Sequence, residues 1–166
     1  MKRFLILLLF AVGANAQTIT TSTNTVTRPA TTPSLTANQA VGTGLPVVLT
    51  NVVASVKPAR IMKVIVSAQQ TSYTPTLRVW FYAGTNVTAQ TDASAFAINA
   101  VDAASTLGYV DVGPLNTGTD CLIEENALAR LPISPTTNSI AFAIQSLTAW
   151  NPASSLKILV SVTTSQ

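Results

Sequence analysis

Apolar residues gather in short runs along most of the chain, separated by turn-forming residues. In the clearest run, residues 156–163, the apolar residues Leu156, Ile158, Val160 and Val162 alternate with Lys157, Leu159, Ser161 and Thr163. A period of two places alternate side chains on opposite faces of a β-strand. Further runs rich in β-branched or aromatic residues predict strands over 45–56, 61–68, 76–83, 107–112 and 139–147.

One segment departs from this pattern. Residues 91–104 are rich in alanine and open with Thr91 and Asp92, residue types that cap helices, so they predict one or two short helical turns. Strands at short spacing with a single helical insertion predict an all-β fold. We therefore expect a single antiparallel β-sandwich over residues 40–166, jelly-roll-like in architecture, whose strand order the pattern leaves open.

Residues 17–39 precede the predicted sandwich and contain few large apolar side chains. Their abundance of Thr, Ser and Pro predicts an extended, weakly packed N-terminal arm. Such an arm can contact a neighbouring subunit. The candidate contact residues are Thr25, Val26, Thr27, Arg28 and Pro29.

Residues 1–16 have the parts of an export signal. Lys2 and Arg3 precede an apolar stretch at 4–12, and Ala14-Asn15-Ala16 has the form of a cleavage site. The stretch is too short for a permanent membrane span. We expect cleavage after Ala16, and the alternative is a retained apolar segment that packs against a neighbouring subunit.

Composition limits the classes of partner. Only 9% of the 166 residues are charged and the net charge is +3, to which Lys2 and Arg3 contribute two. The remaining cations form no dense basic face, which argues against nucleic-acid binding. A polar but nearly uncharged surface loses little charge solvation on contact, so it favours association between subunits.

The residues for most catalytic sites are missing. The chain contains no histidine, which excludes the commonest general base and metal ligand, and we expect no enzyme activity and no cofactor. Cys121 is the only cysteine and is interpreted as a small buried residue. Asp120, Glu124 and Glu125 lack the spacing of a calcium loop and are interpreted as a solvated loop, with a calcium site or a carboxylate pair as alternatives.

Aromatic side chains leave room for a carbohydrate site. Trp80, Phe81 and Phe142 sit inside apolar runs, which predicts core packing. Tyr73 and Trp150 lie close to loop prolines, so they are the candidates for exposed rings that could stack on a cell-surface glycan.

Several short motifs occur in an order that resembles a group of tailed-bacteriophage virion structural proteins. They are Thr25-Val26-Thr27-Arg28-Pro29-Ala30, Leu77-Arg78-Val79-Trp80-Phe81-Tyr82, the segment 92–97, Leu107-Gly108-Tyr109-Val110, Leu131-Pro132-Ile133 and Trp150-Asn151-Pro152-Ala153. The resemblance implies a capsid-associated role, such as head decoration, with no catalytic residues. The export-type N-terminus departs from that family.

Two functional hypotheses follow. In the first, the chain is a virion structural protein on the capsid surface, and its partners are other copies of itself and a major capsid protein. In the second, it is a secreted sandwich module that binds a surface glycan or assembles into an extracellular filament. Neither requires nucleic acid or a membrane span.

Overall fold

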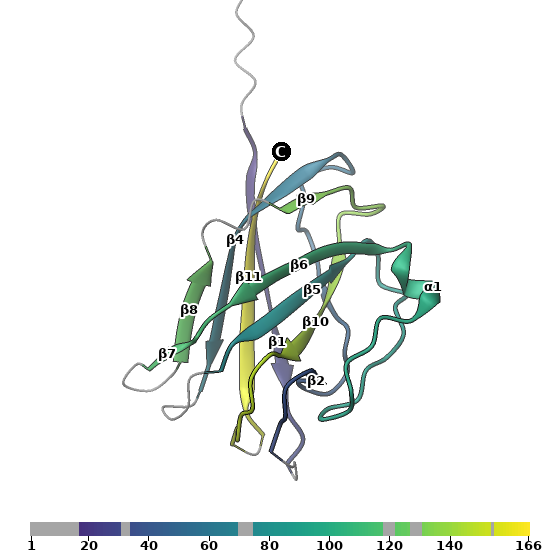
Figure 1. Cartoon of the computed structure of the whole chain (residues 1–166). Helices are drawn as coiled ribbons and strands as arrows, with labels where there is room; N and C mark the ends of the chain where they lie inside the picture. Colours follow the sequence, from purple (N-terminus) through teal and green to yellow (C-terminus); the bar gives the residue numbers. More distant parts are fainter. Residues whose placement is uncertain (1–16, 31–33, 70–74, 118–121, 127–130, 154) are drawn as a thin grey trace, which may run out of the picture.

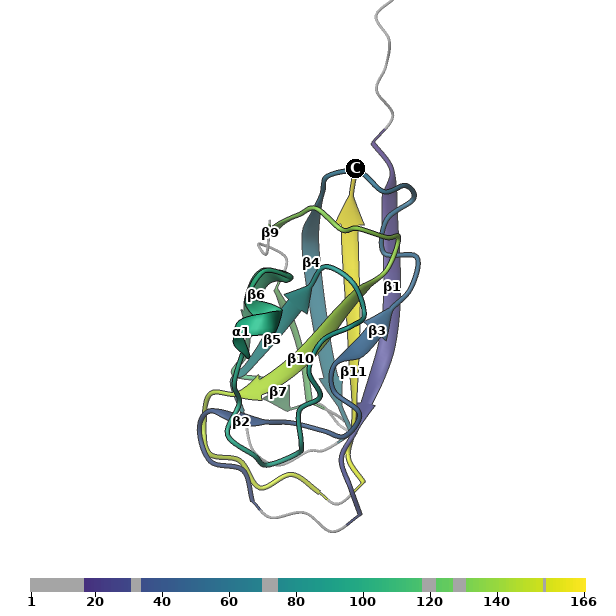
Figure 2. The ribbon, with the colours of Figure 1, turned by 90° about the vertical axis from the view of Figure 1, so that its right-hand side faces the viewer.

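Two antiparallel β-sheets pack face to face in the computed structural model, which describes residues 17–30, 34–69, 75–117, 122–126, 131–153 and 155–166 (Figures 1 and 2). The first sheet has the order β1-β11-β4-β8-β7, with β9 also paired to β4. The second has the order β2-β10-β5-β6, with β3 also paired to β10. The strands are β1 (Ile19–Thr27), β2 (Gln39–Ala40), β3 (Val47–Leu49), β4 (Ala59–Ala68), β5 (Leu77–Tyr82), β6 (Thr106–Val112), β7 (Asn116–Thr117), β8 (Leu122–Asn126), β9 (Leu131–Ile133), β10 (Ile140–Ser146) and β11 (Lys157–Ser165).

The strand order is that of a jelly roll. The eight principal strands are β1, β3, β4, β5, β6, β8, β10 and β11. When they are counted in chain order, the first sheet reads 1-8-3-6 and the second reads 2-7-4-5. This interleaving of early and late strands in both sheets is the double Greek key of jelly rolls. The predicted jelly-roll-like sandwich is therefore confirmed.

Alternation along the strands builds the core. In β11, Ile158, Val160 and Val162 are buried, whereas Lys157 and Leu159 are exposed on the opposite face, as the period of two predicts. The second sheet contributes its own inward row, in which Phe142 of β10 pairs with Phe81 of β5. Burial of each large apolar side chain stabilises the fold by about 1.5–3 kcal/mol.

The predicted arm is extended but not weakly packed. Residues 19–27 form β1, which pairs with β11 without a register shift from Ile19↔Ser165 to Thr27↔Lys157. Ser22 and Val26 face the interior, and Leu35 is also buried. The prediction was wrong about packing because threonine supports a strand through its β-branched shape and backbone pairing, with few large apolar side chains.

A buried ion pair fixes the end of β1. Arg28 is 1% exposed, and its Nε and Nη2 donate to Oδ1 and Oδ2 of Asp92 at 3.0 and 2.8 Å. The backbone N–H of Gly42 donates to the same Oδ1 at 2.6 Å. Gly42 has φ +109°, and a Cβ there would lie 1.9 Å from Cγ1 of Val26. Glycine is therefore required where the three segments meet.

The helical insertion is smaller than predicted. Only Ala100–Ala103 form the helix α1, and its N-cap Asn99 makes no side-chain capping bond. Asp92 does not cap a helix, because its carboxylate pairs with Arg28. Within the described residues, no helix is long and apolar enough to cross a membrane.

Loss of the buried arginine should destabilise the fold strongly. Arg28→Met leaves the Asp92 carboxylate buried without its cation, so we expect the free energy of unfolding, measured in urea, to fall by about 3–5 kcal/mol. The double variant Arg28→Met/Asp92→Leu should recover much of this loss. Arg78→Met is the matched control, because Arg78 pairs with Asp111 at the surface and should cost about 1 kcal/mol or less. Equal losses in the two single variants would contradict the prediction.

Alkaline pH should weaken the fold through Tyr82. Burial raises the pKa of this phenol from 10.0 to about 12, and the nearby Asp102 carboxylate adds to the effect. The folded protein then keeps a proton that the unfolded chain releases above pH 10, so stability falls as pH rises from 10 towards 12. Urea unfolding of the wild type and of Tyr82→Phe across this range measures the effect. The free energy of unfolding should fall less steeply with pH in the variant than in the wild type. Equal slopes would contradict the prediction.

Candidate functional site

The outer surface of the second sheet carries two cross-strand rows of functional side chains. In one row, Arg78 of β5 lies between Gln145 of β10 and Asp111 of β6. In the next, Trp80 lies between Ala143 and Tyr109. The intervening residues of β5, Val79 and Phe81, point inward and are buried. Alternation along β5 therefore directs Val79 and Phe81 into the core and directs the two rows of polar and aromatic side chains to the outer surface.

Arg78 is held between a carboxylate and an aromatic ring. Its Nε and Nη2 donate to Oδ1 and Oδ2 of Asp111 at 2.6 and 2.9 Å. Its guanidinium carbon lies 3.8 Å from the centroid of the Tyr109 ring and 5.7 Å from that of Trp80. The hydrogen bonds to Asp111 raise the pKa of Arg78 above its usual value, although burial acts in the opposite direction. The result is a planar cation stacked on a π-surface.

Trp80 is half-buried between two other rings. The Phe96 ring stacks on it at 5.9 Å and the Tyr109 ring lies tilted at 4.7 Å. Trp80 Nε1 donates to Gln145 Oε1 at 2.9 Å, and Gln145 Nε2 donates to Asn38 Oδ1 at 3.2 Å. These contacts lock the indole in one orientation.

The loop that carries Phe96 covers part of the sheet. The backbone N–H of Phe96 donates to the carbonyl of Asn38 at 2.8 Å, and Gln39 forms a bridge with Ala95. Tyr109 lies beyond this cover and is 45% exposed. Together, Arg78, Trp80, Phe96, Tyr109 and Asp111 form a surface that we call the aromatic face. It presents a rigid, largely apolar surface with one ion pair, suited to binding rather than to proton transfer.

The predicted glycan residues do not form this site. Trp150 is 2% exposed, and its backbone exchanges two hydrogen bonds with Leu35, at 2.9 and 2.7 Å. The prediction of an exposed ring at Trp150 was wrong, because the residue is buried where its backbone pairs with that of Leu35. Tyr73 lies outside the described residues.

Trp80 was predicted to pack in the core, and Tyr109, one of the aromatic residues of the chain, was not singled out as a candidate for exposure. Phe81 and Phe142 are buried as predicted, but Trp80 is on the outer side of β5. The available signal was the matching spacing of Arg78-x-Trp80 and Tyr109-x-Asp111 on two predicted strands. In antiparallel neighbours this spacing places both pairs on one face.

The candidate contact residues of the arm are integrated into the fold. Thr25, Val26 and Thr27 pair with Leu159, Ile158 and Lys157, and Val26 is in the core. Arg28 binds Asp92, and the carbonyl of Pro29 accepts a hydrogen bond from the N–H of Ser155 at 3.1 Å. Only the exposed positions of this segment are left for contacts with another subunit.

The acidic segment forms a strand rather than the expected solvated loop. Glu124 and Glu125 belong to β8 and pair through the backbone with Val66 and Ile65 of β4. Asp120 and Cys121 lie outside the described residues. Within the part of the chain that the structure describes, no three His, Cys, Asp or Glu side chains gather to hold a metal ion.

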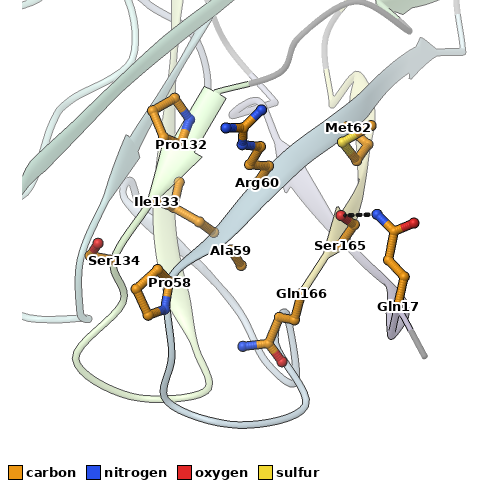
Figure 3. Close-up of a pocket in the computed structure, with 10 residues that line it drawn as sticks. All are labelled: Gln17, Pro58, Ala59, Arg60, Met62, Pro132, Ile133, Ser134, Ser165 and Gln166. Atoms are coloured by element: carbon orange, nitrogen blue, oxygen red, sulfur yellow. Dashed lines mark hydrogen bonds between the residues drawn. The ribbon is translucent and has the colours of Figure 1, made fainter. Parts of the chain in front are cut away.

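A shallow groove of about 540 Å³ lies at the end of the sandwich where Gln17 meets the C-terminus (Figure 3). The side chain of Gln17 donates to Ser165 Oγ at 2.6 Å along one wall. Arg60 is the one charged side chain among the described lining residues. Among the described lining residues there is no Asp, Glu, His or Cys side chain, so the aromatic face is the stronger candidate site. The lining residues are Gln17, Pro58, Ala59, Arg60, Met62, Pro132, Ile133, Ser134, Ser165 and Gln166.

No family model matches the chain, so the resemblance to tailed-bacteriophage proteins has no support from that comparison, and no curated protein matches it. Among solved structures, the chain is similar to one of Desmodium yellow mottle tymovirus, with 13% identity and a TM-score of 0.28 over 99% of this chain and 88% of the other. At that TM-score the two chains superpose poorly, so the jelly-roll assignment rests on the strand order of this chain.

Proposed function

We propose that the protein is a non-enzymatic virion structural protein, located on the capsid surface as a decoration or head accessory protein, and that it binds its partners through the aromatic face. The observation that carries the proposal is the half-exposed stack of Trp80, Tyr109 and Arg78 on the outside of the second sheet. Tryptophan, tyrosine and arginine are the residues that contribute most to protein–protein interfaces.

The pre-formed geometry of this face favours binding. Trp80 is fixed by Gln145 and Phe96, and Arg78 by Asp111, so few side-chain rotamers remain to be ordered when a partner docks. Less ordering leaves more of the contact energy available for affinity. The low charge of the chain acts in the same direction, because little charge must be desolvated.

Three of the segments that resemble the phage proteins meet at this face. Residues 77–82 provide Arg78 and Trp80, residues 92–97 provide Phe96, and residues 107–110 provide Tyr109. The second of these also contains Asp92, which anchors the covering loop to Arg28. Their convergence supports the proposal. The fold is compatible with a virion role but does not distinguish it from glycan binding, since jelly rolls occur in both capsid and lectin domains.

The proposal predicts association with particles that depends on Tyr109. Particles from the organism that carries the gene are purified by density, and intact mass identifies the protein in that fraction. Purified Tyr109→Ser protein should bind stripped particles at least about tenfold more weakly than wild type, as expected for an interface hot spot.

Leu159→Ser is the matched control. Leu159 is an apolar residue of similar exposure, 40%, on the outer side of the first sheet. Its replacement should leave particle binding unchanged. Absence of the protein from particles, or equal binding by wild type and Tyr109→Ser, would overturn the proposal.

A secreted glycan-binding module is the second candidate, and the exposed Tyr109 ring beside the Asp111 carboxylate favours it. Sugar rings stack on aromatic faces while their hydroxyls bond to carboxylates and amides. In this case the purified protein should give hits on a glycan array, and Tyr109→Ala should remove them while Trp150→Ala, a change in a buried residue, should affect only stability. An array without hits would exclude the glycan-binding candidate.

A further inference from the structure

Besides the aromatic face, the edge of the first sheet at β1 is a second candidate contact surface. β1 is the terminal strand in the order β1-β11-β4-β8-β7, and within the described part of the chain it forms a ladder only with β11. Toward the end at Thr27 it lies beside β3. The connection from β3 to β4 continues along β1 (Figure 2), where Ser22 Oγ on the inner side of β1 donates to the carbonyl of Thr50 at 2.7 Å. We infer that the end of β1 at Ile19 pairs with β1 of a second copy of the chain, which joins two first sheets into one continuous antiparallel sheet.

The hydrogen-bond pattern shows which residues face the free edge. Thr18 and Gln166 exchange both backbone bonds, at 3.1 and 2.9 Å, and the N–H of Arg28 donates to the carbonyl of Leu156. In an antiparallel ladder, bonded and non-bonded pairs alternate. With an unbroken register between these two points, the even-numbered residues of β1 bond to β11. The odd-numbered residues therefore direct their N–H and C=O groups away from the sheet.

The half of this edge near Thr27 is already occupied. The carbonyl of Thr27 accepts the N–H of Thr43 at 2.8 Å, and the N–H of Thr25 donates to Asn24 Oδ1 at 2.7 Å. Asn24 in turn donates from Nδ2 to the carbonyl of Val48. Among the described residues, the outward backbone groups of Ile19, Thr21 and Thr23 have no such partners. They form a short template for one added strand.

This template lacks the usual protection against edge pairing. Natural edge strands carry a charge, a proline or a bulge that discourages association. Residues 17–27 contain no charged residue and no proline, and the register with β11 has no shift. At its start Ile19 is 67% exposed, one of the most exposed large apolar side chains in the described chain.

The sequence of the edge makes it complementary to itself. A two-fold axis at Thr21 pairs Thr21 with Thr21 of the second copy and Ile19 with Thr23, all of them residues whose backbone groups face outward. Each such pair exchanges two backbone bonds. Cross-strand pairs of β-branched and hydroxyl side chains are favourable, and two neutral strands do not repel each other. Because a two-fold contact uses the same edge on both copies, no further copy can be added there and the assembly ends at a dimer.

Charge substitutions at the axis test this inference in the full-length chain. Thr21→Lys or Thr21→Glu alone places like charges opposite each other in the dimer. We expect the dissociation constant of the dimer, measured by sedimentation equilibrium, to rise at least tenfold. Equal amounts of the two variants should form a heterodimer. The same pair of changes at Thr25, an exposed position where the edge is occupied, is the matched control and should have no effect.

Backbone substitution gives an independent test. Thr21→Pro removes an outward N–H without breaking the ladder with β11, so it should yield a folded monomer, whereas Thr21→Val should still dimerise. Hydrogen exchange should show the amides of Ile19, Thr21 and Thr23 becoming protected as protein concentration rises. A wild type that is monomeric at all concentrations, or a dimer that the Thr21 variants leave intact, would overturn the inference. The aromatic face takes no part in these measurements, so their failure would leave the proposed function untouched.

Discussion

The ion pair between Arg28 and Asp92 is the contact on which the arrangement of both sheets depends. It ties the end of β1 in the first sheet to the loop that covers the second, and it includes the N–H of Gly42. The same loop places Phe96 against Trp80 and thereby orients the aromatic face. Removing one partner of such a buried pair is costly, but replacing both by apolar residues often is not. We therefore expect the pair to act mainly by fixing one position of the loop, because few other positions would satisfy both buried groups.

Sequence patterns predicted the strands that bury apolar side chains on a period of two, and with them the sandwich. They did not predict β1, because its pairing relies on backbone bonds and threonine rather than on large apolar residues. β8 was hidden by Glu124 and Glu125, which suggest a loop when pairing with β4 is unknown. Trp80 stands in the run Val79-Trp80-Phe81, where only the register with β6 and β10 shows which ring faces outward. Trp150 is buried where its backbone pairs with the distant residue Leu35, a contact that the sequence pattern does not show.

The two candidate contact surfaces lie on different sheets. The aromatic face lies on the outer surface of the second sheet, and the end of β1 at Ile19 is at an edge of the first. A strand added beside β1 extends the first sheet sideways and leaves the aromatic face uncovered. A pair of copies would then present two aromatic faces to one surface. Two linked weak contacts bind much more tightly than one when their spacing matches the target.

The pairing of Thr18 with Gln166 also determines how the molecule responds to mechanical load. β1 and β11 are antiparallel, and the first residue pair of their ladder lies beside the point where both strands reach the same end of the sandwich (Figure 1). A pulling force applied between Gln17 and Gln166 would act on one hydrogen-bonded pair at a time and unzip the two strands from that end. β1 is the terminal strand of its sheet, so such a force would separate it from β11 before it reached β4 and the strands beyond.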